Sequence, residues 1–402
     1  MALGDASTRV RVMIVATHPI QYHVPWFQQL AAQPGLELRV CYAELPDPAR
    51  QGVGFGLAFQ WDIPLLEGYA WSVLQTAPRR RSGQGFLVLR LRRLGAVLAQ
   101  MQPQVVIVTG WQSWSLVQVV LACRWHGIPC CVRGESSGLK PRPWWVRAIH
   151  RLLLRGYDAF LVIGKANRAF YSAYGVPDSR LFDAPYFVDN KRFHEQAMSL
   201  RDMREGLRSR WGIPAGAVCF CYVGKLEPKK RIMDLLRALE RVRKRGSEPP
   251  LHLLVVGAGE LEGETRRFVA QHGLPVGFAG FLNQSEIAQA YVAADCLVLP
   301  SDYGETWGLV VNEAMACGIP ALVSDRVGCA LDLIEEGKTG AVFPFADITA
   351  LAGRLTGLAA DPDHLRSLGE QARAGVLQCY GVDHAVAGTL AAIHALSGRR
   401  RA

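Results

Sequence analysis

Short apolar runs alternate along the whole chain with longer segments whose apolar positions recur at helical spacing. Such runs predict buried strands, and the segments between them predict helices, so the chain should be of the α/β class with parallel sheets. In the first half we expect strands at 9–16, 36–42, 105–109, 129–132 and 160–163, and helices at 25–32, 87–101, 114–125 and from 165. In the second half we expect strands at 218–223, 251–259, 276–280, 296–299, 321–324 and 341–343, and helices from 232, 309, 348, 362 and 382.

The composition is that of a globular protein with about two domains, since the chain has 402 residues, of which 50% are hydrophobic and 20% charged. Its ten cysteines include no CxxC pair with a matching His or Cys partner, which argues against a zinc site and favours a reducing cytosol. The N-terminus has no apolar core of signal-peptide length, and no run reaches about 18 apolar residues. We therefore expect a cytoplasmic protein that neither spans a membrane nor is secreted through a signal peptide.

Two classes of function, nucleic-acid binding and dinucleotide-dependent dehydrogenation, are disfavoured. A net charge of +10 suggests nucleic acid, but the basic residues form no recognisable nucleic-acid motif, so no such partner is expected. The string Gly-Ala-Gly-Glu at 257–260 resembles a dinucleotide fingerprint, yet it lacks the third glycine and lies in the wrong half of the chain. A dehydrogenase is excluded on that ground.

Residues 301–325 read as a loop, a helix and a strand, with the carboxylates Glu305 and Glu313 on either side of the helix start. The first N–H groups of a helix have no internal partner and carry partial positive charge, which favours an anion such as a phosphate. Carboxylates repel a phosphate but accept hydrogen bonds from a sugar diol. A ligand with both phosphates and sugars, such as a nucleotide sugar, suits both the helix start and the carboxylates. The alternative is that both carboxylates only complement the helix dipole.

The spacing Glu305-x7-Glu313, followed by Ala-Met-Ala-Cys-Gly-Ile-Pro, closely resembles the signature of the retaining glycosyltransferases of family 4. The resemblance implies the GT-B fold, in which two Rossmann-like domains face each other across a cleft. It implies an N-terminal acceptor-side domain at 1–190, a C-terminal nucleotide-sugar-binding domain at 191–381, and a helix at 382–402 that crosses back to the first domain.

The same resemblance implies a donor site in the second domain. The string that starts at Gly224-Lys225 and reaches Lys230 is similar to the family's phosphate-binding pattern, with Arg231 where glycine is common. Lys225 and Lys230 would hold the diphosphate, Glu313 the ribose hydroxyls and Glu305 the hydroxyls of the donor sugar. The loop 281–283 would hold the base, mostly through backbone. The implied catalytic residues are Glu305, Lys230 and Lys225, and the implied donor-binding residues are Gly224, Lys225, Lys230, Leu282, Trp307, Gly308, Leu309, Val310 and Glu313.

Candidates for the acceptor side follow two strands of the first half. Thr17 and His18 follow the first strand, and ligands bind at the carboxyl ends of strands in open α/β folds. Arg133 and Glu135 follow the strand at 129–132. Alternatively, His18 is a turn residue with no functional role, and Arg133 and Glu135 form a structural pair. The irregular insertion at 46–86 is expected to shape the acceptor site.

Residues 140–155 predict a basic amphipathic helix that contains tryptophan. Arg147, Arg151 and Arg155 recur at every fourth position, and another face carries Trp145, Ala148, Ile149, Leu152 and Leu153. Such a helix can lie on an anionic membrane surface. Alternatively its apolar face packs inside the domain and its arginines are simply solvated.

The expected function is therefore that of a retaining, hexosyltransferase-type glycosyltransferase in cell-surface glycan (polysaccharide) or glycolipid synthesis. Its partners would be a nucleotide-diphosphate sugar, a glycan or lipid-linked hydroxyl acceptor, and the inner face of the cell membrane as a peripheral site. No cofactor beyond this co-substrate and no metal is expected, because the DxD string at 361–363 lies at a helix start, where aspartates serve as caps. A sugar-nucleotide epimerase or a phosphorylase of the same fold, and a non-catalytic nucleotide-sugar-binding protein, stay open as alternatives.

Overall fold

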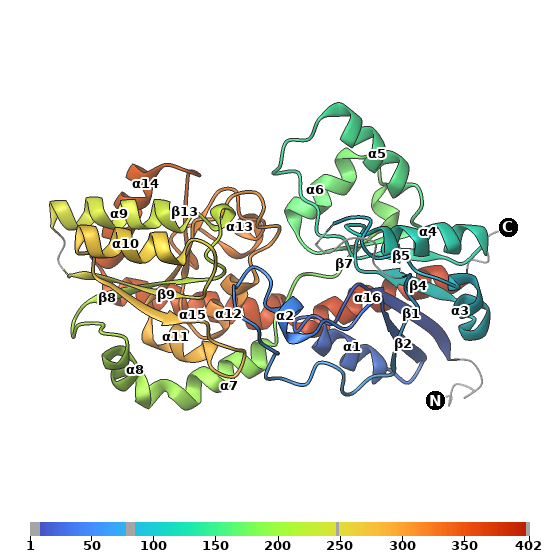
Figure 1. The fold of residues 1–402 in the computed structure, drawn as a ribbon, viewed down its shortest axis with the longest axis horizontal. Helices are drawn as coiled ribbons and strands as arrows, with labels where there is room; N and C mark the ends of the chain where they lie inside the picture. The colour runs from blue at the N-terminus through green and yellow to red at the C-terminus, as the bar shows by residue number, and fades with distance from the viewer. Residues whose placement is uncertain (1–8, 78–84, 247–248, 399–402) are drawn as a thin grey trace. The chain divides into compact units, whose positions relative to one another are not determined.

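The computed structural model describes residues 9–77, 85–246 and 249–398, which form two compact units (Figure 1). Unit 1 comprises Met1–Pro46, Pro64–Tyr186 and Val382–Ala402, and unit 2 comprises Asp47–Ile63 and Phe187–Gly381. The short segment Asp47–Ile63 thus belongs to unit 2, although the chain on both sides of it belongs to unit 1.

Unit 1 is built on a seven-stranded sheet in which all the described pairings between strands are parallel. The strands lie in the order β3-β2-β1-β4-β5-β6-β7. Their bounds are β1 Val10–Ala16, β2 Leu36–Tyr42, β3 Trp71–Val73, β4 Val105–Val108, β5 Cys130–Val132, β6 Ala159–Val162 and β7 Leu181–Asp183.

The helices of unit 1 are α1 Val24–Ala31, α3 Leu94–Met101, α4 Trp114–Trp125, α5 Trp144–Leu154, α6 Lys165–Ala173 and α16 Val382–Ser397, with a 3-10 turn at Asp178–Arg180. One core cluster includes Val108 of β4, Leu116 of α4, Phe160 of β6 and Phe170 of α6. Burying one such side chain contributes about 1.5–3 kcal/mol. α16 packs against α1, β6 and β7, and the Trp26 indole Nε1 donates to Thr389 Oγ1 at 3.1 Å. The last helix is therefore part of the packed interior of unit 1.

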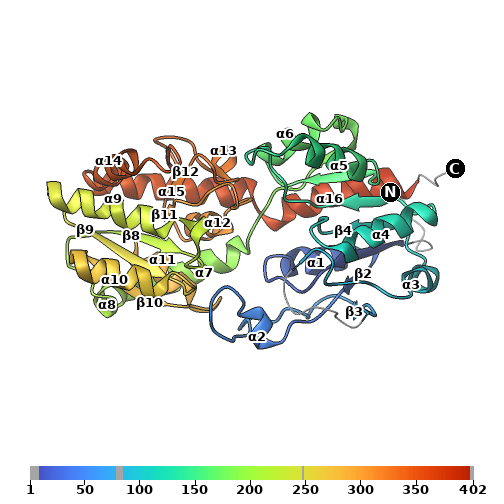
Figure 2. The ribbon, with the colours of Figure 1, turned by 45° about the horizontal axis from the view of Figure 1, so that its top comes forward.

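Unit 2 contains a six-stranded parallel sheet in the order β10-β9-β8-β11-β12-β13. The strands are β8 Val218–Val223, β9 Leu251–Val256, β10 Val276–Gly280, β11 Cys296–Leu299, β12 Ala321–Ser324 and β13 Gly340–Phe343. Helices lie on both faces of this sheet, as Figure 2 shows. The helices of unit 2 are α2 Pro48–Gln51, α7 Asn190–Leu200, α8 Arg204–Arg210, α9 Ile232–Arg245, α10 Glu262–His272, α11 Ile287–Ala293, α12 Leu309–Ala316, α13 Ala330–Leu333, α14 Ile348–Ala359 and α15 Pro362–Cys379, with 3-10 turns at Arg201–Met203 and Pro228–Lys230.

The strand order reverses once in each sheet, between β1 and β4 in unit 1 and between β8 and β11 in unit 2. At such a switch point the connections that follow the two central strands run to opposite faces and leave a crevice between them, where open α/β sheets bind ligands. In unit 2 the two loops are residues 224–231, after β8, and residues 300–308, after β11.

Two predicted segments differ from the structure. The helix predicted at 87–101 begins only at Leu94, because Leu91 pairs with Thr76 in an isolated antiparallel bridge and its backbone N–H donates to Gln118 Oε1 at 2.9 Å. The polar stretch up to Arg210, which the sequence predicts as a connection to the second domain, instead contains the helices α7 and α8. Asp189 caps α7 by accepting from the Arg192 N–H, and Phe193 and Ala197 are its buried face.

The residue before α9, Arg231, has a left-handed backbone with φ of 56°. This conformation costs a residue with a side chain about 1–2 kcal/mol and costs glycine almost nothing, which explains why glycine is common here in the family that the sequence resembles. The guanidinium of Arg231 offsets part of the cost by pairing with Asp234 at 2.6 Å.

We expect Arg231→Gly to be more stable than Arg231→Ala by about 1–2 kcal/mol, because both variants lose the ion pair but only glycine relieves the backbone. Urea unfolding of the two purified variants measures this difference directly. An alanine variant as stable as the glycine variant would contradict the strained backbone at this position.

Candidate functional site

An ion pair joins the two loops at the switch point of unit 2. The Nζ atom of Lys230, in the loop after β8, contacts Oε2 of Glu305, in the loop after β11. Only 14% of the Lys230 side chain and 15% of the Glu305 side chain are exposed. Two residues that lie 75 positions apart in the sequence thus form one charged centre at the carboxyl edge of the sheet.

The loop that carries Glu305 is held by backbone hydrogen bonds at both ends. The Asp302 N–H donates to the Lys229 carbonyl at 2.9 Å, which fixes the start of the loop to the loop after β8. The Gly328 N–H donates to the Glu305 carbonyl at 3.1 Å, and the Cys329 N–H donates to the Trp307 carbonyl at 2.9 Å. The carboxylate is therefore presented from a rigid loop, and little conformational entropy remains to be lost on binding.

The helix α12 begins directly beside this pair, with Gly308 as its N-cap residue in a left-handed conformation, φ 104°. A Cβ atom at Gly308 would lie 2.9 Å from Leu299 Cδ2 and 3.1 Å from Val327 Cγ1, so packing also requires glycine. No side chain caps this helix start. The N–H groups of Leu309 and Val310 have no intrahelical partner by helix geometry and present partial positive charge.

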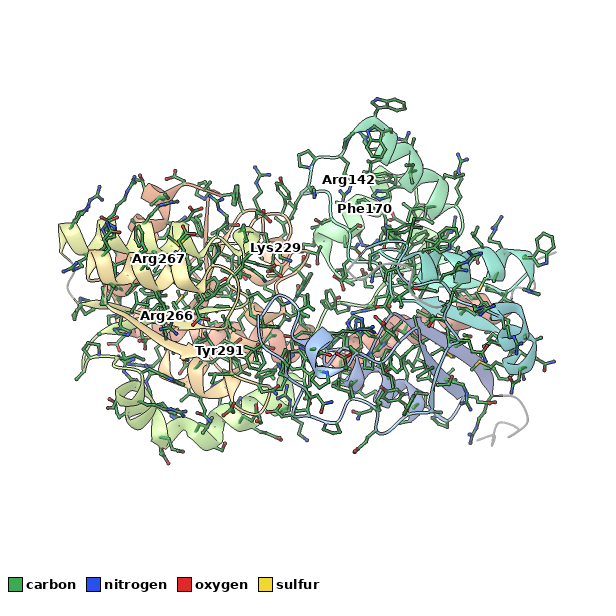
Figure 3. All side chains as sticks on the ribbon, in the orientation of Figure 1. Arg142, Phe170, Lys229, Arg266, Arg267 and Tyr291 are labelled. Atoms are coloured by element: carbon green, nitrogen blue, oxygen red, sulfur yellow. The ribbon has the colours of Figure 1, made fainter. Side chains whose placement is uncertain are left out.

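Glu313 lies one turn into α12 and is 1% exposed. Its Oε2 atom accepts a hydrogen bond of 2.6 Å from the hydroxyl of Tyr291, a buried residue of α11 that is labelled in Figure 3. In the same helix, Asn312 Oδ1 accepts from the Trp307 indole Nε1 at 2.8 Å. Sequence reasoning missed Tyr291 and Asn312 as supports of the site, since both lie in mainly apolar helical segments where a polar partner has no local signal.

Lys225 lies in the same loop as Lys230 but has different neighbours. Its Nζ atom donates to the Val53 carbonyl at 3.0 Å and lies 4.8 Å from the ring centroid of Phe55. Its own carbonyl accepts from the Tyr222 hydroxyl at 2.8 Å. Burial lowers the pKa of Lys225, and the nearby Glu227 opposes that shift. No sequence pattern predicted that residues 53–55 would lie against this lysine.

The remaining donor-side candidate, Leu282, lies in the loop after β10, which is two strands away from β8 in the sheet. The structure thus brings Lys230, Glu305, Gly308 and Glu313 together around the loop after β11, whereas Leu282 belongs to a separate loop. That loop contacts the segment Asp47–Ile63 of the same unit.

The acceptor-side candidates lie in unit 1, where Thr17 and His18 follow β1 directly. Thr17 Oγ1 and His18 Nδ1 share a hydrogen bond of 3.0 Å. Burial lowers the pKa of His18, with Glu44 acting in the opposite direction. A neutral imidazole that already has a polar partner is suited to hydrogen bonding with a hydroxyl.

Arg133 is only 2% exposed and is engaged by the protein itself. Its guanidinium donates to the carbonyls of Ala184 at 2.7 Å and Pro185 at 3.2 Å, and its Cζ lies 5.2 Å from the Trp26 ring centroid and 5.1 Å from that of Tyr186. The Tyr186 hydroxyl donates to Glu135 Oε1. Arg133 therefore holds the segment at which the chain leaves unit 1, and Glu135 supports that arrangement through Tyr186.

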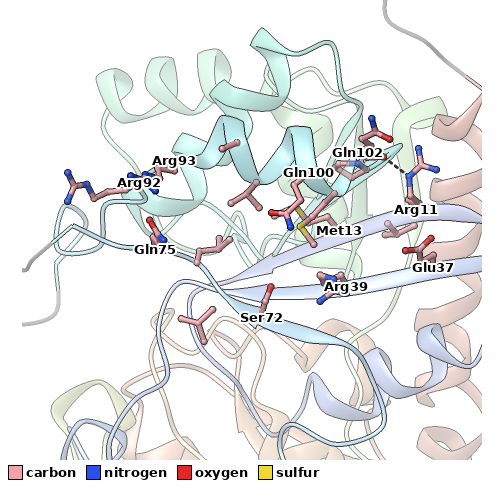
Figure 4. Close-up of a pocket in the computed structure, with 17 residues that line it drawn as sticks. Arg11, Met13, Glu37, Arg39, Ser72, Gln75, Arg92, Arg93, Gln100 and Gln102 are labelled. Carbon is pink, nitrogen blue, oxygen red and sulfur yellow. Dashed lines mark hydrogen bonds between the residues drawn. The ribbon is translucent and has the colours of Figure 1, made fainter.

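A cavity of about 710 Å³ in unit 1 lies between α3 and the strands β1, β2 and β3. Its lining includes the cations Arg11, Arg39, Arg92 and Arg93. Figure 4 shows Arg11 and Arg92 at opposite ends of this cavity, with their guanidinium groups directed away from each other. Arg11 also lies near the amino end of β1, and Arg39 lies at the midpoint of β2, so neither is at the carboxyl edge of the sheet. The charges do not converge on one point, so the cavity is no focused anion site.

The helix α5 attaches to unit 1 by one face and leaves another in solvent. His150 packs against the rings of Trp111, Phe170 and Tyr174, and Leu154 is buried. Just before the helix, Arg142 lies 5.2 Å from the Phe170 ring (Figure 3). The apolar side chains of the other face are exposed, namely Trp144 at 80%, Trp145 at 54%, Ile149 at 56% and Leu152 at 71%. The alternative that this apolar face packs inside the domain is therefore wrong for Trp145, Ile149 and Leu152, although Leu153 packs against the core.

No group of three or more His, Cys, Asp or Glu residues with metal-binding geometry occurs within 9–77, 85–246 and 249–398. The capping role predicted for Asp361 is confirmed, because its carboxylate accepts from the His364 N–H at 2.9 Å. Asp363 pairs with Arg366 at 2.8 Å. A search of the described helices finds none with the length and apolar character that crossing a membrane requires.

Two family models match the chain. Residues 9–185 match the glycosyl transferase 4-like domain, and residues 203–375 match the glycosyl transferases group 1 model. A GDP-mannose-dependent α-(1-6)-phosphatidylinositol monomannoside mannosyltransferase of Mycolicibacterium smegmatis is 31% identical over 243 residues, which is 57% of this chain and 61% of that protein. A sulfoquinovosyl transferase of Arabidopsis thaliana is 29% identical over 263 residues, 64% of this chain and 48% of that protein.

Solved structures share the fold at low sequence identity. A sucrose-phosphate synthase from Thermosynechococcus elongatus superimposes with a TM-score of 0.71 at 21% identity and covers 97% of this chain and 100% of its own. The Anabaena protein HepE, solved with UDP and glucose, has a TM-score of 0.69 at 16% identity and covers 96% of this chain and 100% of its own.

The matches to curated relatives span between 43% and 61% of those proteins' own length. The two family models nevertheless cover both units, and each unit has the parallel α/β sheet that the solved relatives share. The chain belongs to glycosyltransferase family 4 and has the GT-B fold.

Proposed function

We propose that this protein is a retaining glycosyltransferase that moves a sugar from a nucleotide-diphosphate sugar to a hydroxyl acceptor in glycan or glycolipid synthesis. The observation that carries the proposal is the Lys230–Glu305 ion pair beside the uncapped start of α12. It combines a cation and helix N–H groups suited to phosphate with a carboxylate suited to sugar hydroxyls. A relative named for GDP-mannose, and a structure of the same fold solved with UDP and glucose, support a nucleotide-diphosphate donor.

In the proposed donor complex the two partners of the ion pair separate. Lys230 turns to the diphosphate together with Lys225, and Glu305 accepts hydrogen bonds from the hydroxyls of the donor sugar. Such an exchange is feasible because each charged group gains a new partner in place of the old one, so that neither charge stays buried and unpaired. A carboxylate has about four acceptor sites, so Glu313 can accept ribose hydroxyls in addition to the Tyr291 hydroxyl.

The chemical step breaks the bond between the anomeric carbon and the diphosphate oxygen and forms a bond from that carbon to the acceptor oxygen. Negative charge develops on the leaving diphosphate, where the two lysines and the N–H groups of Gly308 and Leu309 stabilise it. The acceptor proton passes to the leaving phosphate on the same face, as the family resemblance implies. We propose that these fixed positive charges replace a metal ion.

We further propose that the enzyme works as a peripheral protein on the cytoplasmic face of the cell membrane, where the acceptor would be a lipid-linked or surface glycan. The exposed apolar face of α5 and the adjacent stripe of Arg147, Arg151 and Arg155 support this location. The tryptophans can enter the interface while the arginines contact anionic headgroups, each worth about 1 kcal/mol.

The donor assignment predicts different effects for the two carboxylates. Glu313→Gln should weaken binding of GDP or UDP by roughly 10-fold, as loss of a charge-assisted hydrogen bond does. Glu305→Gln should leave nucleotide affinity unchanged or raise it, because Lys230 loses a competing partner, while transfer from the nucleotide sugar is lost. Calorimetry with the nucleotide and a transfer assay separate these effects. Equal loss of nucleotide binding in both variants would reject the assignment of separate roles.

The stereochemical prediction is that the donor's anomeric configuration survives in the product, and that transfer continues in excess EDTA. Proton NMR of the first product formed shows the configuration. An inverted linkage would reject the retaining mechanism, and loss of activity in EDTA that added metal restores would reject metal independence. Release of free sugar nucleotide isomers without any acceptor would instead indicate an epimerase.

The membrane prediction is that the protein sediments with vesicles containing anionic lipid and not with purely zwitterionic vesicles. Replacing Arg147, Arg151 and Arg155 by Gln should weaken the binding by roughly 100-fold, since each contributes about 1 kcal/mol. Arg237, Arg241 and Arg245 of α9 have the same spacing, and their replacement by Gln is the matched control that should retain binding. If both triple variants bind equally well, α5 is not the membrane contact.

A further inference from the structure

The segment Asp47–Ile63, which we name the strap, is a compact loop with its own internal bonds. Asp47 caps the short helix α2, and the Phe59 N–H donates to the Pro48 carbonyl at 3.2 Å, which closes the loop on itself. Gly54 and Gly56 have left-handed backbones, with φ of 89° and 73°. The strap therefore has a defined shape and is more than an extended linker.

One end of the strap is fastened to the loop after β10. The Asp62 carboxylate accepts from the Ser285 N–H at 3.2 Å and from the Ser285 hydroxyl. The side-chain amide of Asn283 donates to the Gln60 carbonyl at 2.7 Å. Because these hydrogen bonds involve both backbone and side-chain atoms, they fix this end of the strap in one position against the loop after β10.

Aromatic rings fasten the middle of the strap to the same loop. Phe59 lies 4.4 Å and Phe55 5.1 Å from Phe281, centroid to centroid, and Trp61 packs edge-on against Phe59. Aromatic pairs at these separations are stabilising beyond the area that they bury. The strap thus covers Phe281, which begins the loop 281–283 that would hold the nucleotide base.

The middle of the strap also contacts the lysine that the proposed donor site uses. The Val53 carbonyl accepts from Lys225 Nζ at 3.0 Å, and the face of Phe55 lies 4.8 Å from the same atom. A carbonyl oxygen and a ring face are both electron-rich, so they satisfy the ammonium group as a phosphate oxygen would. A phosphate oxygen that took the position of the Val53 carbonyl around Lys225 Nζ would displace that part of the strap.

We infer that the strap is an autoinhibitory contact, which holds Lys225 through Val53 and Phe55 until a donor diphosphate takes its place. The inference depends on the proposed function, because it assigns Lys225 to the diphosphate. When the strap is seated, only the released fraction of molecules is fully competent, and the apparent affinity for the nucleotide is lowered by that fraction. Weakening the strap's anchor should therefore strengthen nucleotide binding.

The test compares Asp62→Ala, which removes the anchor on Ser285, with Glu286→Ala, which removes an exposed carboxylate next to that anchor without touching the strap. Asp62→Ala should bind UDP or GDP more tightly than the parent, by roughly 3- to 10-fold, as expected when a seated competitor is loosened. The control should bind like the parent. Ser285→Ala, which removes only the hydroxyl donor, should show a smaller gain in the same direction and remains informative if Asp62→Ala folds poorly.

Hydrogen–deuterium exchange provides a second readout on the parent protein. Nucleotide should accelerate exchange of the strap amides at 52–62 and slow exchange at 305–313. Slower exchange in the strap, or weaker nucleotide binding by Asp62→Ala, would show that the strap is part of the bound site and overturn autoinhibition. If neither nucleotide binds to the parent or to Asp62→Ala, the donor site itself is rejected, and the inference with it.

Discussion

The contact between Lys230 and Glu305 depends on the strand order of unit 2, and much of the candidate site depends on that contact. Two opposite charges with little exposure each require the other, because removal of one leaves a buried charge without compensation. The pair forms only because β8 and β11 are neighbours and the order reverses between them, which places the loops that follow these strands side by side. The starts of α9 and α12 follow the same two loops.

Backbone requirements and buried partners make this site rigid. Gly308 has a left-handed conformation in contact range of Leu299 and Val327, so α12 can begin only at this point. Tyr291 and Asn312 fix Glu313 and Trp307 from within the core. A charged group that is held in one rotamer loses little entropy when a ligand binds, and the same rigidity keeps the start of α12 uncapped and electropositive.

The two surfaces that lie outside this rigid centre have opposite characters. On α5 four apolar side chains, Trp144, Trp145, Ile149 and Leu152, are more than half exposed, and apolar surface that is open to water is unfavourable. In the strap the apolar side chains are already matched, Phe55 and Phe59 with Phe281, and its carbonyl at Val53 is matched with Lys225. The first surface is thus open to solvent, whereas the second is already in contact with the rest of unit 2.

The sequence by itself determined the local elements and the chemistry of the donor loops. Apolar runs predicted strands such as 218–223 and 296–299 with the observed bounds, because burial on both faces of a parallel sheet requires such runs. The motif spacing identified Glu305, Glu313, Lys225 and Lys230 as candidates. Tertiary structure alone decided which of them meet, since Lys230 pairs with Glu305 whereas Lys225 contacts the strap. Tertiary structure also decided that Arg133 is buried against main-chain carbonyls and that the apolar face of α5 is exposed. The local sequence pattern shows that a helix is amphipathic, but long-range packing decides which of its faces is covered.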